Sequence, residues 1–445
     1  MNTYIRSPYL IKRIFFNIEA LRRNVFRRNR HYKVLRDKLD FSLLFCLDED
    51  YIFKKANEFI EYANKNVDYY RGVFDRKKIN LLKDFVKLPL LEKEDIKKNY
   101  KRLLSDKLSA KKAWEGVTSG STGSPLVFFR DPESVTYNQI YYEKYYKYLG
   151  CDIRKNKVRL SGVKILPFNQ LRPPFWVYVD LYKQLQCSVF HICRDTYKLY
   201  LNEFSKLKTD FGTGFTSAWK ALALLMNKDK VKFKGLKAII TDSEPIDSRG
   251  RAEIEKAFRC PVYSTYGLGE AGMVAVECRK HHYHIITLSY LVEIIDKQGK
   301  QVKDGQAGEI VVTDLNSKNC PIIRYRTGDM GIISHNDCGC GINSPYLSEI
   351  VGRIDDYMWT GDGRMFNHIN GIIKVAKNID MSQIVLKNGK EIIIRVVPAN
   401  NFEPNSMKRV IKEARDYVGD MSVRWETVED LKRMPSGKVK FFVKE

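Results

Sequence analysis

Residues 118–125 form a short segment rich in hydroxyl groups and glycine, and an apolar stretch follows at 126–130. The segment reads Thr-Ser-Gly-Ser-Thr-Gly-Ser-Pro, and the stretch after it has the composition of a strand. Glycine lets backbone N–H groups turn toward a phosphate, and hydroxyls add further donors. A flexible linker is the alternative, but the segment adjoins apolar strands and does not bridge domains. We therefore predict a nucleotide-phosphate loop formed by Thr118, Ser119, Gly120, Ser121, Thr122 and Gly123.

Two common nucleotide sites are excluded by the motifs of the chain. The chain has no G-x-x-x-x-G-K-[ST] motif, and Ser124 stands directly after the second glycine of the loop, where a P-loop has Lys. No G-x-G-x-x-G follows an early strand either. The loop is therefore neither a P-loop nor a Rossmann fingerprint.

Length and composition set the broad class of the protein. A chain of 445 residues predicts two or three domains, and an apolar share of 44% is enough to build their cores. It contains no run of eighteen apolar residues and no secretory signal. Nine cysteines at scattered spacings indicate free thiols in a reducing compartment. We therefore expect a cytoplasmic protein.

The positive charge of the chain is concentrated at its N-terminus. The formal net charge is +24, and residues 1–38 carry eleven Lys or Arg against two acids, a net of +9. Such a surface suits anionic ligands, nucleic acid or anionic lipid. No nucleic acid is expected as a partner.

Residues 8–38 have the periodicity of a basic amphipathic helix. The apolar stripe consists of Ile11, Ile14, Phe15, Ile18, Leu21 and Val25. This stripe either packs on its own domain or lies at the inner membrane surface as a peripheral anchor. Internal packing is slightly favoured, and the membrane alternative stays open.

Alternating strands and helices predict an α/β fold. Residues 236–241 indicate a buried strand, a turn follows at 242–245, a helix runs to about residue 259, and 261–265 indicate another strand. We expect a large N-terminal domain with several subdomains and helix-covered sheets over residues 1–352. Its first 90 residues form a basic helical lead-in.

The predicted pattern of strands and helices changes after Gly352. Short strands, an Asn388-Gly389 turn and one charged helix near 405–418 predict a small mobile α+β domain over residues 357–445. Residues 353–356 are expected to form the hinge between the two domains.

Four further motifs follow the phosphate loop in the chain. A carboxylate near phosphates suits a hard cation such as Mg²⁺, and a fixed Asp can accept hydrogen bonds from two hydroxyls. A helix-start Glu and an Arg/Asp pair in a surface turn are the structural alternatives for the first and second motif. The motifs are Tyr266-Gly267-Leu268-Gly269-Glu270, Arg324-Tyr325-Arg326-Thr327-Gly328-Asp329, Gly352-Arg353-Ile354-Asp355-Asp356 and Pro435-Ser436-Gly437-Lys438.

The ordered set, spread over residues 118–438, resembles the adenylate-forming superfamily of acyl-CoA synthetases. The closer resemblance is to phenylacetate–coenzyme A ligase and its capsule-polysaccharide-biosynthesis relatives. The resemblance implies that Tyr266 stacks on adenine beside Gly267, that Glu270 holds Mg²⁺ and that Asp329 binds the ribose hydroxyls. It also implies an adenine loop at Ser243, Glu244 and Pro245.

The same resemblance implies roles for the C-terminal motifs. Arg353 would reach the ribose or phosphate, and Asp355 would be the pivot of the small domain. Lys438 would neutralise the carboxylate and α-phosphate while the adenylate forms. Gly269 departs from the family, which has Thr at this position as a contact to the α-phosphate.

Cysteine and histidine residues in two distant loops form a candidate metal set. Cys338 and Cys340 lie in one loop, and Cys278 precedes a group of three histidines in the other. Three thiolates and one imidazole suit a structural Zn²⁺ ion, and unligated thiols are the alternative. The phenylacetate–coenzyme A ligase-like branch has similar Cys positions, and its pattern selects His284 as the fourth ligand.

These features together predict an ATP-dependent, AMP-forming ligase. A small carboxylic acid and MgATP would give an acyl-adenylate and pyrophosphate, and the acyl group would pass to coenzyme A or to an amine or sugar acceptor in polysaccharide biosynthesis. The expected cofactors are ATP, Mg²⁺ and structural Zn²⁺, with coenzyme A as an option. The alternative is a nucleotide-binding regulatory module, or a membrane-surface scaffold for polysaccharide assembly, without full ligase chemistry.

Overall fold

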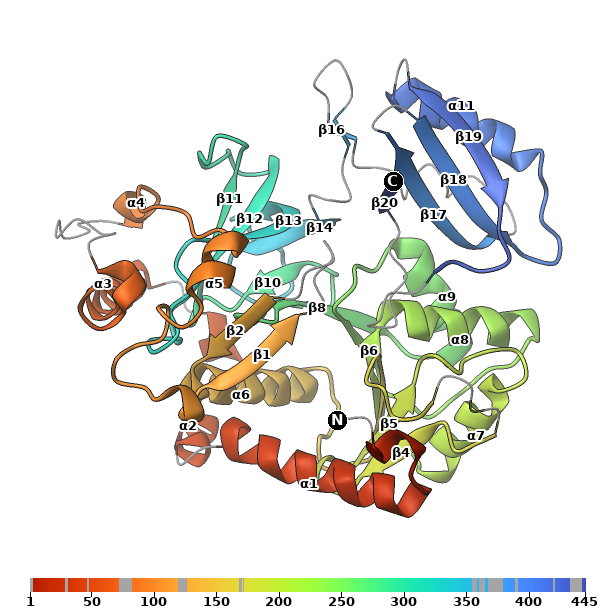
Figure 1. Cartoon of the computed structure of the whole chain (residues 1–445), viewed down its shortest axis with the longest axis horizontal. Helices are drawn as coiled ribbons and strands as arrows, with labels where there is room; N and C mark the ends of the chain where they lie inside the picture. Colours follow the sequence, from red (N-terminus) through yellow and green to blue (C-terminus); the bar gives the residue numbers. More distant parts are fainter. Residues whose placement is uncertain are drawn as a thin grey trace. The chain divides into compact units, whose positions relative to one another are not determined.

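The chain folds into two compact units, Met1–Ile350 and Val351–Glu445 (Figure 1). The computed structural model describes residues 3–28, 31–45, 48–71, 82–118, 126–167, 170, 172–353, 358–359, 365–366, 379–388, 391–418, 421–432 and 442–445. Among these residues, no helix combines the length and the apolar character needed to span a bilayer.

The N-terminal unit begins with a series of helices and a two-stranded sheet. The α-helices up to this sheet are α1 (Tyr9–Arg27), α2 (Tyr32–Lys38), α3 (Glu49–Asn66), α4 (Leu82–Phe85) and α5 (Lys93–Asn99). The 3-10 helices are η1 (Thr3–Arg6), η2 (Ser42–Phe45), η3 (Asp68–Tyr70) and η4 (Ala110–Lys112). The two strands are β1 (Trp114–Thr118) and β2 (Leu126–Arg130), which pair antiparallel with Thr118 opposite Leu126.

A 12-stranded sheet forms the body of this unit, in the order β11-β12-β13-β14-β10-β9-β8-β7-β6-β3-β5-β4. The first strands are β3 (Lys157–Ser161), β4 (Trp176–Val179), β5 (Gln184–Ser188), β6 (Phe211–Phe215), β7 (Ile239–Asp242) and β8 (Val262–Leu268). The later strands are β9 (Gly272–Glu277), β10 (Tyr283–Ile285), β11 (Tyr290–Ile295), β12 (Ala307–Asp314), β13 (Tyr325–Ser334) and β14 (Tyr346–Arg353). The remaining helices are α6 (Pro132–Tyr148), η5 (Asp180–Tyr182), α7 (Tyr197–Lys206), α8 (Thr216–Lys228) and α9 (Ser248–Phe258).

Strand pairing changes direction at β8. This strand pairs parallel with β7 and antiparallel with β9. Strands β3, β6 and β7 are joined by parallel pairings, because helices carry the chain back between them. On the other side of β8, strand β9 pairs antiparallel with β10, and β10 pairs antiparallel with β14. Strands β11, β12 and β13 follow one another in antiparallel pairs. The carboxyl end of β8 therefore lies where the two halves of the sheet meet.

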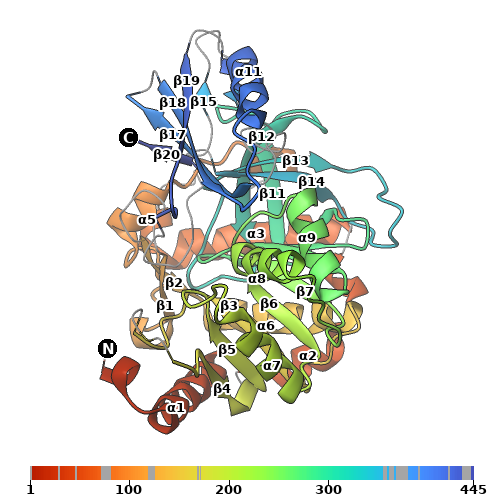
Figure 2. The same cartoon turned by 90° about the vertical axis from the view of Figure 1, so that its right-hand side faces the viewer.

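Helices cover both faces of the sheet, as the α/β prediction requires. Helices α7, α8 and α9 pack on one face and α6 lies against the other, as the two views show (Figures 1 and 2). Large aromatic side chains fill both layers. On the first face they are Tyr197, Tyr200, Phe204, Trp219 and Phe258, and on the second face Tyr141 and Tyr145 of α6 meet Phe211 and Tyr263.

The N-terminal helix differs from the expectation in two respects. The helix expected over 8–38 is divided into α1, which ends at Arg27, and α2, which begins at Tyr32. The preference for internal packing of the apolar stripe is wrong, because the stripe is exposed. The opposite side of α1 carries Phe16 and Ala20 and packs on the unit instead.

The C-terminal unit has its own small core. A 4-stranded sheet of order β19-β18-β17-β20 packs against one helix through apolar side chains, and a short hairpin precedes it. The elements are β15 (Met358–Trp359), β16 (Met365–Phe366), β17 (Ile379–Lys387), β18 (Glu391–Pro398), α11 (Ser406–Val418), β19 (Ser422–Thr427) and β20 (Phe442–Lys444). The predicted hinge residue Asp355 and the predicted catalytic Lys438 lie outside the described residues.

A buried polar network connects α6 to β12. Ser134 Oγ donates to Oδ2 of Asp314 at 2.8 Å, and the N–H of Asn316 donates to Oδ1 at 3.0 Å. Asp314 is fully buried, and burial raises the pKa of its carboxyl to about 6. The folded state therefore binds a proton more tightly at this carboxyl than the unfolded chain does.

We expect the stability of the fold to depend on pH through Asp314. A raised pKa adds stability below about pH 4, and that contribution is lost as the pH rises through about 6. Asp314→Asn keeps the shape of the side chain and removes the titration. The free energy of unfolding of the wild type, measured by urea titration, should therefore fall relative to that of the variant between these pH values. A difference that stays constant over this range would contradict the assignment.

Candidate functional site

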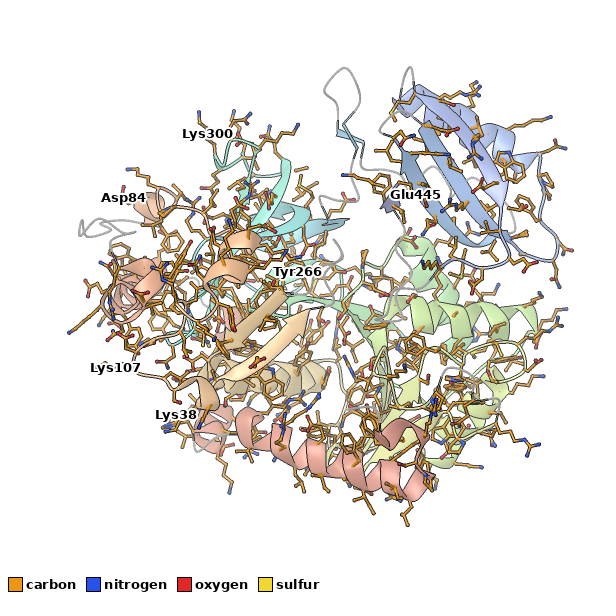
Figure 3. All side chains as sticks on the ribbon, in the orientation of Figure 1. Lys38, Asp84, Lys107, Tyr266, Lys300 and Glu445 are labelled. Carbon is orange, nitrogen blue, oxygen red and sulfur yellow. The ribbon has the colours of Figure 1, made fainter. Side chains whose placement is uncertain are left out.

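Tyr266 and Asp329 join the end of β8 to strand β13. Tyr266 Oη donates to Oδ2 of Asp329 at 3.0 Å, and Tyr266 is labelled inside the N-terminal unit in Figure 3. Burial, and then the charge of Asp329, raise the pKa of the Tyr266 hydroxyl well above its ordinary value. The tyrosine therefore stays a neutral donor to the carboxylate.

A tight turn orients the carboxylate of Asp329. The N–H of Asp329 donates to Thr327 Oγ1 at 3.0 Å, and Thr327 Oγ1 donates to the carbonyl of Ile310 at 2.7 Å. Gly328 between them has a φ of +73°, which glycine adopts without strain. The Thr-Gly-Asp order thus has a local structural reason, and the turn fixes the Asp against β12.

Glu270 lies two residues after the end of β8 and is buried. It contacts strand β13, as Tyr266 does. Tyr325 Oη donates to Glu270 Oε1 at 2.8 Å. The next residue, Ala271, accepts through its carbonyl from Nη2 of Arg130 at 3.3 Å. Arg130 ends β2, so this bond connects the β1–β2 pair that flanks residues 119–125 to the Glu270 segment.

Arg130 is a buried cation that sequence reasoning missed. Nη2 also contacts Ser134 Oγ at 3.4 Å, and Nε has no hydrogen-bond partner among the residues that the structure describes. Its position at the end of the strand that follows the phosphate loop was the available signal. An arginine that is buried at such a place, with one donor unused, adds positive charge next to the Glu270 segment.

The predicted adenine loop leaves β7 at the same edge of the sheet. Ser243 has a φ of +66°, and Ser243 and Pro245 are exposed. The carboxylate of Glu244 instead accepts from the N–H of Ser217 at 2.7 Å and from its Oγ at 3.1 Å. The start of α8 therefore holds this carboxylate, as expected for an anion at a helix N-terminus.

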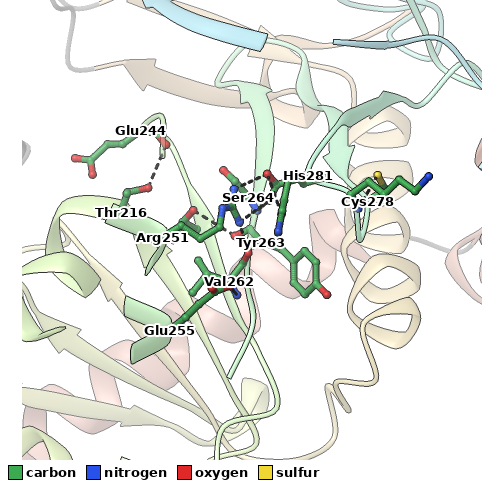
Figure 4. Close-up of polar contacts among 12 residues, drawn as sticks. Thr216, Glu244, Arg251, Glu255, Val262, Tyr263, Ser264, Cys278 and His281 are labelled. Carbon is green, nitrogen blue, oxygen red and sulfur yellow. Dashed lines mark hydrogen bonds and ion pairs between the residues drawn. The ribbon is translucent and has the colours of Figure 1, made fainter. Parts of the chain in front are cut away.

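Polar contacts also anchor the backbone around this edge (Figure 4). Thr216 Oγ1 donates to the carbonyl of Glu244 at 3.2 Å. Glu277 is fully buried, pairs with Arg251 of α9 at 2.5 Å and accepts from the N–H of Ser264 at 2.7 Å. Helix α9 is thereby bound to the antiparallel half of the sheet.

The four residues of the predicted metal set lie together. The ligand atoms of Cys278, His284, Cys338 and Cys340 all lie within 4.8 Å of one another. Cys278 Sγ is 3.7 Å from Cys338 Sγ, and Cys340 Sγ is 3.2 Å from His284 Nε2. Cys278 directly follows β9, His284 is in β10, and the other two lie in the loop before β14.

Neighbouring backbone groups orient these ligand atoms. The N–H groups of Lys280 and Ile342 donate to the sulfurs of Cys278 and Cys340 at 3.3 and 3.4 Å. His284 Nδ1 is 3.2 Å from the carbonyl of Ser344, so Nδ1 carries the proton and Nε2 is the lone-pair nitrogen. Burial lowers the pKa of His284 to about 4, which keeps the imidazole neutral.

Some of the predicted site residues lie outside the part of the chain that the structure describes, and others lie within it. Ser119, Gly120, Ser121, Thr122, Gly123, Asp355 and Lys438 lie outside the described residues. Only the backbones of Thr118 in β1 and Arg353 in β14 are described. Among the residues that are described, Tyr266, Asp329, Glu270 and Tyr325 meet across β8 and β13, and Gly267 lies exposed at the end of β8.

Comparisons with known proteins identify two domains in the chain. Residues 167–316 match the model of the AMP-binding enzyme family, and residues 358–445 match that of the CapK C-terminal domain. The chain is 25% identical to protein CapK of Staphylococcus aureus, over 99% of this chain and 98% of that protein. It is 26% identical to phenylacetate–coenzyme A ligase of Aromatoleum evansii, over 67% and 69% of the two chains.

A solved structure supports the same fold. A 2-hydroxyisobutyryl-CoA ligase, crystallised in the postadenylation state with an acyl-AMP, has a TM-score of 0.69, with 17% identity over 89% of each chain. Two family models, full-length similarity to CapK and this shared fold agree with one another. The chain therefore contains an AMP-binding enzyme domain and a CapK C-terminal domain, is similar to CapK and to phenylacetate–coenzyme A ligase, and shares its fold with a 2-hydroxyisobutyryl-CoA ligase.

Proposed function

We propose that the protein activates a small carboxylic acid with ATP and transfers the acyl group to an acceptor. The observation that carries this proposal is the meeting of two bonded pairs, Tyr266 with Asp329 and Tyr325 with Glu270, at the end of β8. Ligands of open α/β sheets bind beyond the carboxyl ends of strands where the topology changes, and β8 ends at such a place. The pairs combine an aromatic face with two buried or half-buried carboxylates.

Each of these residues has a role in the proposed nucleotide site. Asp329 accepts hydrogen bonds from the ribose hydroxyls, and the loop of Ser243 and Pro245 borders the adenine. Tyr325 engages one carboxylate oxygen of Glu270, and the other oxygen is proposed to bind Mg²⁺. Thr118 to Gly123 would receive the phosphates, which Arg130 would help to neutralise.

Two successive displacements make up the proposed reaction. A carboxylate oxygen of the acid attacks the α-phosphorus of ATP, the bond to the β-phosphate oxygen breaks, and pyrophosphate leaves. Lys438 and Arg353 are proposed to offset the negative charge that accumulates in this step. The acceptor then attacks the acyl carbon and AMP leaves, after a movement of the small domain about Asp355.

The acceptor is proposed to be coenzyme A or an amine or sugar group. Coenzyme A is the first candidate, because several of the similar proteins are named as CoA ligases. A sugar or amine acceptor, and with it a role in polysaccharide biosynthesis, is proposed from the resemblance of the motifs to the capsule-polysaccharide-biosynthesis relatives of phenylacetate–coenzyme A ligase. Release of AMP from preformed acyl-adenylate, measured with each acceptor class, distinguishes them. If no candidate acid gives pyrophosphate while ATP still binds, the protein is a regulatory nucleotide module instead.

The four-residue set in the β9–β14 region is proposed to bind a structural zinc ion. A tetrahedron with Zn–S bonds of about 2.3 Å has edges of about 3.8 Å. The 3.7 Å between the sulfurs of Cys278 and Cys338 fits this edge and is far longer than a disulfide. All four ligands come from the protein, which is typical of a structural site and leaves no open position for catalysis.

Asp329→Ala should weaken ATP binding more than tenfold. The ribose hydroxyls lose a charged acceptor, and such hydrogen bonds contribute about 1.5–3 kcal/mol. Calorimetric titration with ATP measures the change, and Asp304→Ala, at an exposed Asp of the same unit, is the matched control. Tyr266→Phe removes the hydroxyl but keeps the carboxylate, so it separates ribose binding from the orientation of Asp329. Unchanged ATP affinity in Asp329→Ala would remove the ribose role.

Lys438→Ala should slow adenylate formation by about 10²–10³, because one positioned charge at the transition state is lost. ATP affinity should change little, and transfer from preformed acyl-adenylate should be much less affected. Pyrophosphate release and AMP release measure the two half-reactions separately, with Lys432→Ala at an exposed lysine as the control. Equal losses in both halves would show that Lys438 does not act in one step.

Zinc should co-purify at about one ion per chain. Cys338→Ser should lower both the zinc content and the melting temperature, because metal binding contributes to folding. Cys193→Ser, at an exposed cysteine outside the set, should change neither. Elemental analysis of protein purified without chelator decides the question, and an absence of zinc there would refute the site.

A further inference from the structure

Helix α1 presents its apolar side to solvent. Leu10, Ile11, Ile14, Ile18, Leu21 and Val25 are each between 52% and 72% exposed. At 3.6 residues per turn these six side chains fall within an arc of about 100° on one side of the helix. The helix lies at the periphery of the N-terminal unit in both views (Figures 1 and 2).

Polar contacts hold the other side of α1 on the enzyme. Arg13 Nε and Asn17 Nδ2 donate to Oδ2 of Asp180 at 3.0 and 2.9 Å. Tyr182 Oη donates to the carbonyl of Ala20 at 3.0 Å, and the Arg27 guanidinium lies 5.5 Å from the centre of the Tyr182 ring. These contacts join the helix to η5, so its apolar arc cannot turn inward without breaking them.

Positive charge lies beside the apolar arc and beyond the two ends of α1. Arg22 and Arg23 have side chains that are 76% and 45% exposed, and both pair with Glu19, the one acid among the described residues of α1. Two arginines therefore outweigh that acid, and exposed Arg6 and Arg28 stand beyond the two ends of the helix. An apolar row about 23 Å long, with cations beside it and beyond its ends, has the properties of a helix that lies in the plane of a membrane interface.

We propose that α1 docks the protein on the surface of an anionic lipid bilayer. The apolar arc would enter the boundary between headgroups and acyl chains, while the arginines meet anionic headgroups. A second copy of the chain fits less well, because each copy brings a net charge of +9 over residues 1–38 to the contact. The proposal does not depend on the ligase chemistry, which resides in other elements.

Co-sedimentation with lipid vesicles tests this proposal. The full chain should bind vesicles of phosphatidylglycerol and phosphatidylcholine, bind pure phosphatidylcholine far more weakly, and dissociate at high salt. Ile14→Gln/Ile18→Gln should weaken binding at least about tenfold, because two exposed apolar side chains no longer enter the interface. Arg22→Gln/Arg23→Gln should reduce the difference in binding between the anionic vesicles and the pure phosphatidylcholine vesicles.

Controls separate docking from damage to the fold. Tyr51→Gln replaces a large exposed side chain of α3 and should leave vesicle binding unchanged. Melting temperature and ATP affinity should be the same in the Ile14→Gln/Ile18→Gln variant and the wild type, since these side chains face solvent. A loss of stability would instead mean that the arc is covered within the protein, and would overturn the proposal.

Two further outcomes would also overturn it. Equal vesicle binding by the wild type and the isoleucine variant, or no binding to either vesicle, excludes the arc as a lipid contact. Analytical ultracentrifugation without lipid addresses the second copy. A concentration-dependent dimer that the isoleucine variant abolishes would assign the arc to self-association.

Discussion

Strand β8 has a parallel neighbour on one side and an antiparallel neighbour on the other, and the position of the candidate site depends on these two pairings. On one side β8 follows the parallel order of a helix-connected sheet, and on the other it begins an antiparallel series. Its carboxyl end therefore lies beside the loop after β7 and also within reach of β13. Tyr266 and Glu270 come from this end, and Asp329 and Tyr325 meet them from the antiparallel half. Residues about 60 positions apart are thus brought into hydrogen-bond contact.

Buried charges around this junction are paired with partners on other elements. Arg251 and Glu277 join α9 to β9, and Arg324 of the Tyr-Arg-Thr-Gly-Asp region is bonded through Nε and Nη2 to Glu293 of β11 at 3.0 and 2.9 Å. Breaking one partner of such a pair leaves an uncompensated buried charge, which is far more costly than an exposed pair. The pairs therefore specify how the loops that carry the site are positioned.

The metal set and α1 extend this arrangement in different ways. The Cys and His residues bring the β9–β10 connection and the three-residue strand β10 together with the loop before β14. Helix α1 instead uses its polar side for attachment, with Asp180 as the main acceptor. Because the polar side is attached, the apolar side is exposed, which is the reverse of the usual arrangement for a helix on a globular domain.

The sequence by itself determined the α/β fold, the small C-terminal unit and the order of the motifs, because strand and helix periodicities and glycine-rich turns are local properties. It also singled out Cys278, His284, Cys338 and Cys340, although the 4.8 Å grouping exists only through the pairing of β9, β10 and β14. Periodicity shows that α1 has an apolar side but does not say which side packs, since that depends on Asp180, far along the chain. Two positions were visible only in the tertiary structure: the carboxylate of Glu244 binds the start of α8, and Arg130 is buried beside Ala271. The sequence could not show them, because the partner of each side chain is distant in the chain.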